Sequence, residues 1–143
     1  STGAADGYMP FHKLSQWLSY SLVEPLQELG LQVTGLNDLT GLAEYRNGGL
    51  MIDTGVLVPR HDGIIGAGHR PDSEIIVEWR ALTVALLDEI AAPVREIFAK
   101  SPEEMPLASV LEGGTWAAGR QIAADKREGG LPPINIISDG SVF

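Results

Sequence analysis

The apolar residues of this chain recur every three or four positions over long stretches, which is the spacing of α-helices. A first helix is predicted from Pro10 to Leu29, with a kink at Pro25 and with Gly30 as its end. A second stripe with the same spacing is both polar and aromatic, and it consists of Lys13, Gln16, Trp17 and Tyr20. The first helix is therefore predicted to carry an apolar face and a separate polar and aromatic face.

The most apolar helical pattern follows a pair of good N-cap residues. It predicts a helix from residue 74 to about residue 90 that continues past Pro93 toward Lys100 and is apolar on most sides. Glu78 and Arg80 are the only charges in its most apolar part. A buried charge without a partner costs several kcal/mol, so we expect both side chains to be buried and paired. Such a pair serves either a structural role or a binding site.

A shorter helix is predicted over residues 39–46, with Asp38 as its N-cap and Gly48-Gly49 as its stop. On this helix Glu44 falls on a different face from the apolar residues, so we expect its carboxylate to point away from the packed side. The residues from 48 to 71 are rich in glycine and in turn signals. They are expected to form a loop-rich segment and are a candidate lid.

The C-terminal third contains further helical spacing and one short strand pattern. Residues 107–127 are predicted to form two helical pieces that are broken at Gly113-Gly114, with Thr115 as the cap of the second piece. Residues 131–137 are predicted to form a short strand. The predicted fold class is therefore mainly α, with a minor β element near the C-terminus.

Composition and charge narrow the class of partner. Nineteen acidic and ten basic residues give a net charge of −9, which disfavours nucleic acid because it repels the phosphate backbone. The chain has no cysteine, which excludes disulfides and a thiolate nucleophile and is typical of a cytoplasmic protein. No apolar run approaches the ~18–20 residues of a membrane span. The histidines lack metal-binding spacing, and nucleotide-binding motifs are absent, so we expect no metal and no organic cofactor.

Several charged and aromatic residues lie on or beside the predicted apolar elements. The charges are Lys13, Glu44, Glu78 and Arg80, and the aromatic residues are Trp17, Tyr20, Tyr45 and Trp79. Together these groups suit a small polar ligand that has a ring or another planar part. A carboxylate near a sugar carbon can activate water and stabilise oxocarbenium-like charge, while cations hold an attached phosphate. The set therefore favours an enzyme that cleaves an N-glycosidic bond.

Five segments of the chain carry a specific resemblance that covers nearly its whole length. They are residues 10–18, 39–49, 73–83, 111–120 and 138–143. These segments resemble the uracil-catabolism (URC/urg) family, whose function is unknown. Members of that family are longer, and this chain resembles only their C-terminal part. The resemblance implies a single domain over residues 1–143 within a longer protein, in which an upstream segment or a second chain completes the site.

Three short motifs carry a second, more distant resemblance. They read Lys-Leu-Ser-Gln at 13–16, Ala-Glu-Tyr-Arg at 43–46 and Glu-Trp-Arg-Ala at 78–81. In this order they are similar to motifs of the queuosine-salvage family of queuosine-phosphate N-glycosylases, whose fold resembles that of helical DNA glycosylases. The resemblance implies that Glu44 stands at the position of a catalytic aspartate and Lys13 at that of an active-site lysine. Glutamate in place of aspartate moves the carboxylate outward by one methylene.

The two resemblances together imply an N-glycosidase that acts on a ribosyl-urea phosphate in uracil catabolism and releases urea and ribose phosphate. Glu44 would activate water or stabilise charge at C1, and Lys13 would act beside it. The remaining residues expected to bind the substrate or to hold Glu44 ionised are Arg46, Arg80, Glu78, Trp17, Tyr45 and Gln16. Two alternatives stay open, namely a hydrolase of the ureido carbonyl and a non-catalytic ligand-binding subunit.

Overall fold

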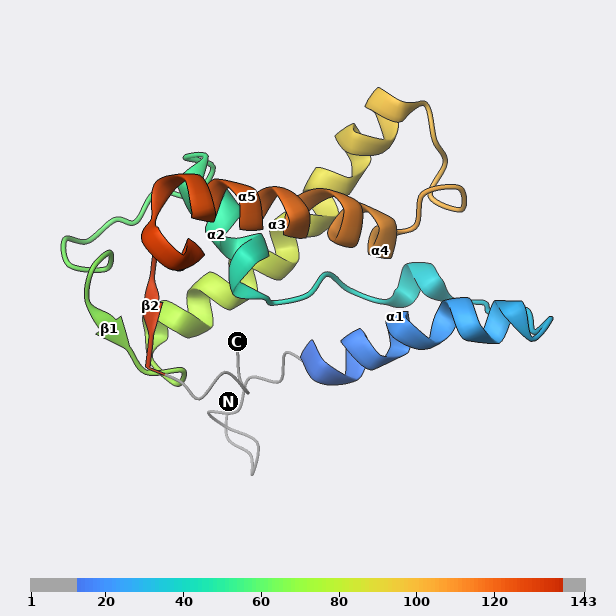
Figure 1. Cartoon of the computed structure of the whole chain (residues 1–143), viewed down its shortest axis with the longest axis horizontal. Helices are drawn as coiled ribbons and strands as arrows, with labels where there is room; N and C mark the ends of the chain where they lie inside the picture. Colours follow the sequence, from blue (N-terminus) through green and yellow to red (C-terminus); the bar gives the residue numbers. More distant parts are fainter. Residues whose placement is uncertain (1–12, 138–143) are drawn as a thin grey trace, which may run out of the picture.

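A computed structural model describes residues 13–137, and helices dominate this part of the chain (Figure 1). The longer helices are α1 (Lys13–Glu28), α2 (Tyr45–Asp53), α3 (Glu74–Phe98) and α5 (Ala117–Lys126). The shorter helical elements are η1 (Leu36–Asp38), α4 (Leu107–Val110), the π-helix η2 (Leu111–Trp116) and η3 (Glu128–Gly130). Among the described residues, no helix has both the length and the apolar character needed to cross a membrane. The predicted mainly α fold class is confirmed.

The short helix α2 packs against both α3 and α5, and two glycines make this close packing possible. A Cβ atom on Gly48 would lie 2.5 Å from Thr83 Oγ1 and 2.7 Å from Trp79 Nε1, both on α3. A Cβ atom on Gly119 of α5 would lie 2.2 Å from the carbonyl oxygen of Arg46. No side chain tolerates such distances, so glycine at these positions allows three helices to meet at the start of α2.

Two apolar clusters form the core. The larger one contains Leu42, Met51, Leu87, Ala91, Leu107, Val110 and Leu111. The smaller one contains Ala43, Ile76, Trp79 and Ile134. The neighbouring residues Leu42 and Ala43 thus belong to different clusters, so the segment that enters α2 is packed from both sides. This packing fixes the position of the next residue, Glu44.

The β structure of the described residues is one short parallel pair. Strand β1 (Gly68–His69) pairs with strand β2 (Asn135–Ile136), and the backbone N–H of Ile137 extends the ladder by donating to the carbonyl oxygen of His69 at 2.8 Å. β2 lies inside the predicted strand segment, whereas β1 lies in a segment predicted to contain turns. The pairing joins positions that are distant in sequence, so the local pattern around β1 did not reveal it.

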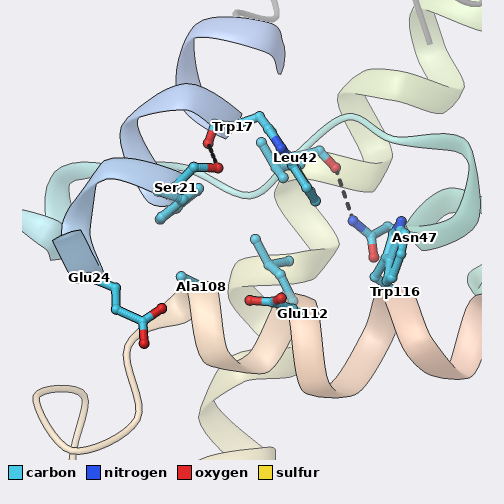
Figure 2. A pocket seen from close by; sticks show the side chains of 10 residues that line it. Trp17, Ser21, Glu24, Leu42, Asn47, Ala108, Glu112 and Trp116 are labelled. Carbon is cyan, nitrogen blue, oxygen red and sulfur yellow. Dashed lines mark hydrogen bonds between the residues drawn. The ribbon is translucent and has the colours of Figure 1, made fainter.

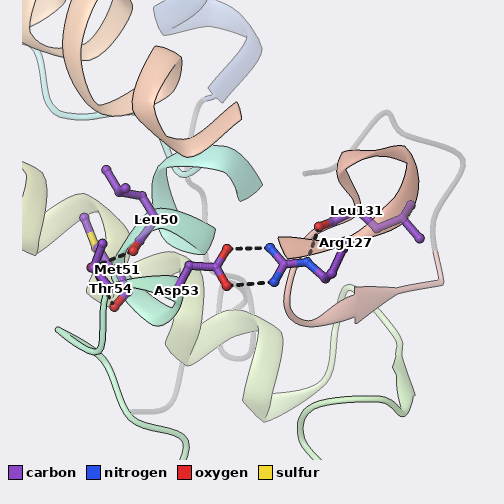
Figure 3. Close-up of polar contacts among 6 residues, drawn as sticks. All are labelled: Leu50, Met51, Asp53, Thr54, Arg127 and Leu131. Carbon is purple, nitrogen blue, oxygen red and sulfur yellow. Dashed lines mark hydrogen bonds and ion pairs between the residues drawn. The ribbon is translucent and has the colours of Figure 1, made fainter. Parts of the chain in front are cut away.

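A bidentate ion pair ties the C-terminal end of α5 to α2 (Figure 3). Arg127 Nη1 donates to Asp53 Oδ1 at 2.7 Å, and Arg127 Nη2 donates to Asp53 Oδ2. The third donor, Arg127 Nε, bonds to the carbonyl oxygen of Leu131 at 2.6 Å. The Asp53 side chain is only 5% exposed. The pair therefore holds the turn that leads to β2 against the body of the protein.

The long predicted helices agree with the structure, whereas the predicted short helix is wrong. α1 and α3 lie where they were expected, and the predicted start of the first helix at residues 10–12 lies outside the described residues. Residues 39–44 are not helical, and α2 begins only at Tyr45. The predicted stop, Gly48-Gly49, lies inside α2 because close packing requires glycine there.

The predicted break at Gly113-Gly114 is also wrong. The chain passes through these glycines in the π-helix η2, which connects α4 to α5 without an interruption. Thr115 does not cap a helix, and its hydroxyl donates to Asn47 Oδ1 at 2.9 Å. This buried hydrogen bond couples the π-helix to the first turn of α2.

Candidate functional site

Glu44 is the N-cap residue of α2, where the backbone is extended (φ −113°, ψ 138°). Its Oε2 accepts hydrogen bonds from the backbone N–H groups of Arg46 at 2.8 Å and Asn47 at 3.3 Å. Its Oε1 accepts from Arg46 Nη1 at 3.3 Å, and the residue is 5% exposed. The expectation that Glu44 points away from the packed side is therefore wrong. The side chain turns back because the first turn of a helix leaves N–H groups without backbone partners.

Burial increases the affinity of the Glu44 carboxylate for a proton. Desolvation raises its pKa above the ordinary value of 4.5. The backbone N–H and guanidinium of Arg46, the N–H of Asn47 and the charge of Lys13 act in the opposite direction, because each favours the ionised form. The carboxylate is thus a stronger base than that of an exposed glutamate and is held in one orientation.

Lys13 lies at the start of α1 and shares the electrostatic environment of Glu44. Partial burial lowers the pKa of its ammonium group from 10.5, the charge of Glu44 raises it, and the charges of Arg80 and Arg46 lower it. Arg80 is a buried residue of α3, and burial lowers its pKa as well. The structure therefore brings together predicted site residues from α1, from the start of α2 and from α3.

Aromatic rings surround the guanidinium group that pairs with Glu44. The Arg46 guanidinium carbon lies 4.4 Å from the ring centroid of Tyr45 and 5.5 Å from that of Trp116. Arg120 lies over the same Trp116 ring at 4.8 Å, and the Trp17 ring centroid is 6.4 Å away from it. At such distances a cation is attracted to the face of an aromatic ring, and two tilted rings also attract each other. Trp116 therefore lies against the predicted site residue Trp17 and shares the Arg46 guanidinium with a second one, Tyr45.

The sequence did not single out Trp116 or Arg120 as site residues. Their spacing of four places them on one face of a helix, and this was the available signal. The spacing alone does not reveal that Arg46 and Trp17 lie against the same ring, because both belong to other segments. The continuous π-helix is itself informative, since π-helical turns are frequent at functional sites.

A cavity of about 210 Å³ opens between α1 and the continuous helical segment formed by α4 and η2 (Figure 2). α1 contributes Trp17, Tyr20, Ser21 and Glu24, and the facing side contributes Leu42, Asn47, Ala108, Leu111, Glu112 and Trp116. Glu44 is not a lining residue. Two of its neighbours line the cavity, namely Asn47, which donates to its carboxylate, and Trp116, which lies beside its partner Arg46. The cavity is therefore adjacent to the buried carboxylate.

Two predicted site residues occupy other roles or positions. The Gln16 amide makes two hydrogen bonds with Thr40, to which the Tyr20 hydroxyl also bonds, so these side chains tie α1 to the segment before α2. Glu78 is exposed and lines a different cavity, of about 440 Å³, so the expectation that it is buried is wrong. Residues two apart on a helix are separated by roughly 200°, so Glu78 and Arg80 face different sides. Within residues 13–137, no cluster of three His, Asp or Glu side chains is arranged to hold a metal ion.

Comparison with known proteins gives one family and two related proteins. Residues 1–143 match the model of a family described as "Protein of unknown function (DUF1688)". The chain is 48% identical over 142 residues to Protein urg3 of Schizosaccharomyces pombe, and 43% identical over 157 residues to Uracil catabolism protein 4 of Lachancea kluyveri. Each match covers 96% of this chain and 35% of the relative, so the chain spans about a third of their length. No solved structure matches the chain, and the likeness to helical DNA glycosylases stays a prediction.

Proposed function

Since this chain belongs to the DUF1688 family and is similar to a protein named for uracil catabolism, we propose that it acts in uracil catabolism. Within that pathway we assign it an N-glycosidase activity that converts ribosyl-urea phosphate and water into urea and ribose phosphate. The observation that carries this proposal is the buried Glu44 carboxylate. Its pKa is raised, its orientation is fixed by backbone N–H groups, Arg46 pairs with it, and the charge of Lys13 acts on it.

In the proposed reaction, the oxygen of a water molecule bonds to C1 of the ribose while the bond from C1 to the ureido nitrogen breaks. Glu44 accepts a proton from the water, and its negative charge stabilises the positive charge that develops at C1. The electron pair of the broken bond remains on the nitrogen, which gains a proton and leaves as part of urea. A raised pKa supports this role because it makes the carboxylate a better proton acceptor.

The cations around Glu44 fit the phosphate end of such a substrate. Lys13 is partly buried, and the Arg46 side chain remains 32% exposed, so both are reachable by a ligand. A guanidinium group binds phosphate through two parallel hydrogen bonds, and an ammonium group adds a point charge. Arg80 is more deeply buried than Arg46, and its charge acts on Lys13.

The cavity beside Glu44 fits the planar ureido end. Trp17 and Trp116 offer two tilted aromatic faces, against which a flat neutral group can pack. The carboxylates of Glu24 and Glu112 also line the cavity, and they can accept hydrogen bonds from ureido N–H groups. Their negative charge makes the cavity itself unsuitable for the phosphate, which supports placing the phosphate near the cations.

A non-catalytic ligand-binding module is the second candidate, and one observation favours it. Glu44 is almost fully buried, is paired with Arg46 and does not line the cavity, as is typical of a group that stabilises a fold. In that case the cavity binds a ligand and no bond is broken. An enzyme with this site would need Arg46 or a neighbouring segment to move so that water reaches the carboxylate.

The deciding experiment incubates ribosyl-urea phosphate with a full-length protein that contains residues 1–143, followed by analysis of the products. Equal amounts of urea and ribose phosphate support the N-glycosidase. Ammonia and carbon dioxide, with the sugar still attached to an amino nitrogen, identify a hydrolase of the ureido carbonyl. Saturable binding of the compound without turnover favours the ligand-binding module.

A further inference from the structure

Helix α1 has two opposite faces, and the described part of the chain covers only one of them. On the inner face Gln16 and Tyr20 bond to the segment before α2. Leu14, Leu18 and Leu22 are spaced four residues apart and therefore lie together on the outer face. They are 65%, 59% and 46% exposed, and no residue of α1 is classed as buried. We call these three residues the leucine face.

The leucine face has the properties of an interface. Burial of one leucine side chain is worth ~1.5–3 kcal/mol, so three exposed leucines on one helix forgo a large stabilisation. Contiguous apolar patches on a protein surface mark sites of interaction. Leu29 and Leu31, just beyond the helix, are also exposed. Figure 1 shows α1 at the edge of the molecule.

We propose that the leucine face of α1 is the surface on which the rest of a full-length family chain docks. The two relatives are nearly three times as long as the region they share with this chain, because the match covers 35% of each. The remaining two thirds of such a chain are joined covalently to the matched region and therefore have a high effective concentration at the leucine face.

The charge of the chain favours this occupant over a second copy of the same chain. Two copies would each carry a net charge of −9 and would repel one another. Glu28, near the C-terminal end of α1, adds a negative charge to this helix. The docking segment is therefore expected to present apolar side chains that are flanked by lysine or arginine.

The location of the leucine face connects it to the candidate site. The same helix carries Lys13, which shares the environment of Glu44, and Trp17, which lines the cavity. A segment docked on the outer face would hold α1 against the segment before α2 and so fix these two side chains. This link to catalysis rests on the proposed function, whereas the docking itself does not.

Hydrogen exchange followed by mass spectrometry tests the docking without any activity assay. The matched third of the Schizosaccharomyces pombe protein is replaced by residues 1–143, and this chain is compared with residues 1–143 alone. We expect the amides of α1 to exchange at least ~10-fold more slowly in the long chain. The double change Leu14→Glu with Leu18→Glu should restore fast exchange there. Leu131→Glu, at another exposed leucine next to β2, is the matched control and should not do so.

Equal exchange of α1 in a folded long chain and in the short chain would overturn the proposal. The short chain gives a second test, which holds even if the long chain does not fold. Its α1 amides must exchange fast, it must be monomeric, and Leu14→Glu with Leu18→Glu must leave its melting temperature within about 2 °C of the parent. A dimer with a protected α1, or a clear loss of stability, would show that the leucine face is already covered and would overturn the proposal.

Discussion

The substitution Glu44→Gln tests whether the Glu44 carboxylate has a catalytic or a structural role. The amide has nearly the same shape as the carboxylate. Its oxygen can still accept the hydrogen bonds that the backbone N–H groups of Arg46 and Asn47 donate to Glu44 Oε2. The negative charge is lost, and with it the ability to take a proton from water. Loss of a general base typically lowers the rate by ~10²–10⁴-fold, which corresponds to about 2.7–5.4 kcal/mol at 1.36 kcal/mol per tenfold change.

The expected change in stability is much smaller, because two effects oppose each other. Hydrogen bonds to a charged group are worth ~1.5–3 kcal/mol and those between neutral groups ~1 kcal/mol, so the amide weakens the cap. The amide also removes the cost of burying a charge, which is the main cause of the raised pKa of Glu44. We therefore expect the free energy of unfolding at pH 7 to change by less than about 1 kcal/mol.

The pH dependence of stability gives a check on this reasoning. A carboxyl whose pKa is higher in the folded state than in the unfolded state stabilises the fold fully below its ordinary pKa of 4.5. That contribution is lost as the pH rises through the folded-state pKa. Parent protein should therefore gain stability relative to Glu44→Gln as the pH falls from 7 toward 4.5, as measured by urea denaturation.

The assay follows urea and ribose phosphate in the full-length protein, with thermal melts of the same samples. Glu89→Gln, an exposed glutamate of α3, is the matched control and should keep full activity. Glu44→Asp retracts the carboxylate but keeps the charge, so partial activity in Asp and almost none in Gln would identify the charge as essential. Near-normal turnover in Glu44→Gln would refute the catalytic role. A rate that falls only in proportion to unfolded protein would assign Glu44 to the fold.

Three further predictions concern the pH profile, the helix contacts and the bidentate ion pair. The value of kcat/KM should fall at acid pH with an apparent pKa above 4.5, which Glu44 sets, and at alkaline pH with an apparent pKa below 10.5, which Lys13 sets. Initial rates measured from pH 4 to 11 test this. If Glu44→Gln still shows the fall at acid pH, Glu44 does not set it. Gly119→Ala should destabilise the fold by ~3 kcal/mol or more, because its Cβ would lie 2.2 Å from a backbone oxygen of α2; denaturant melts equal to the parent would show that α5 moves aside easily. Arg127→Ala should cost about 3 kcal/mol by the same measurement, because it leaves the buried Asp53 carboxylate without its partner; a loss below 1 kcal/mol would assign the pair to the solvated surface.

The long helices could be predicted because their local patterns agree with their tertiary environment. α3 combines apolar residues at helical spacing with a preceding N-cap serine, and its observed bounds follow that pattern. α2 could not be predicted in this way. Glutamate is not a favoured N-cap, and Gly48-Gly49 has the composition of a helix end. Only the contact of α2 with Trp79 and Thr83 explains why a glycine stands inside this helix.

The chemistry of the candidate site was more predictable than its geometry. Charges among apolar residues identified Lys13, Glu44 and Arg80, which the structure brings into one electrostatic environment. The predicted orientation of Glu44 was wrong because it assumed a helix over residues 39–46, whereas Glu44 is the N-cap residue before α2. Trp116 was missed because its role depends on rings and cations from three separate segments, which no local pattern encodes.

The π-helix η2 makes the aromatic wall of the cavity tolerant of a one-residue change in chain length. A π-helical turn holds more residues than an α-helical turn, so it acts as a local insertion within an otherwise regular helix. Removing one residue at Gly113, where a side chain would meet no neighbour, would allow the segment to close into an ordinary α-helix. The helix after it would keep its register relative to α4, because the deleted residue is the one that the wider turn had absorbed. Trp116 would still face Trp17, and Gly119 of α5 would still lie against the backbone of α2.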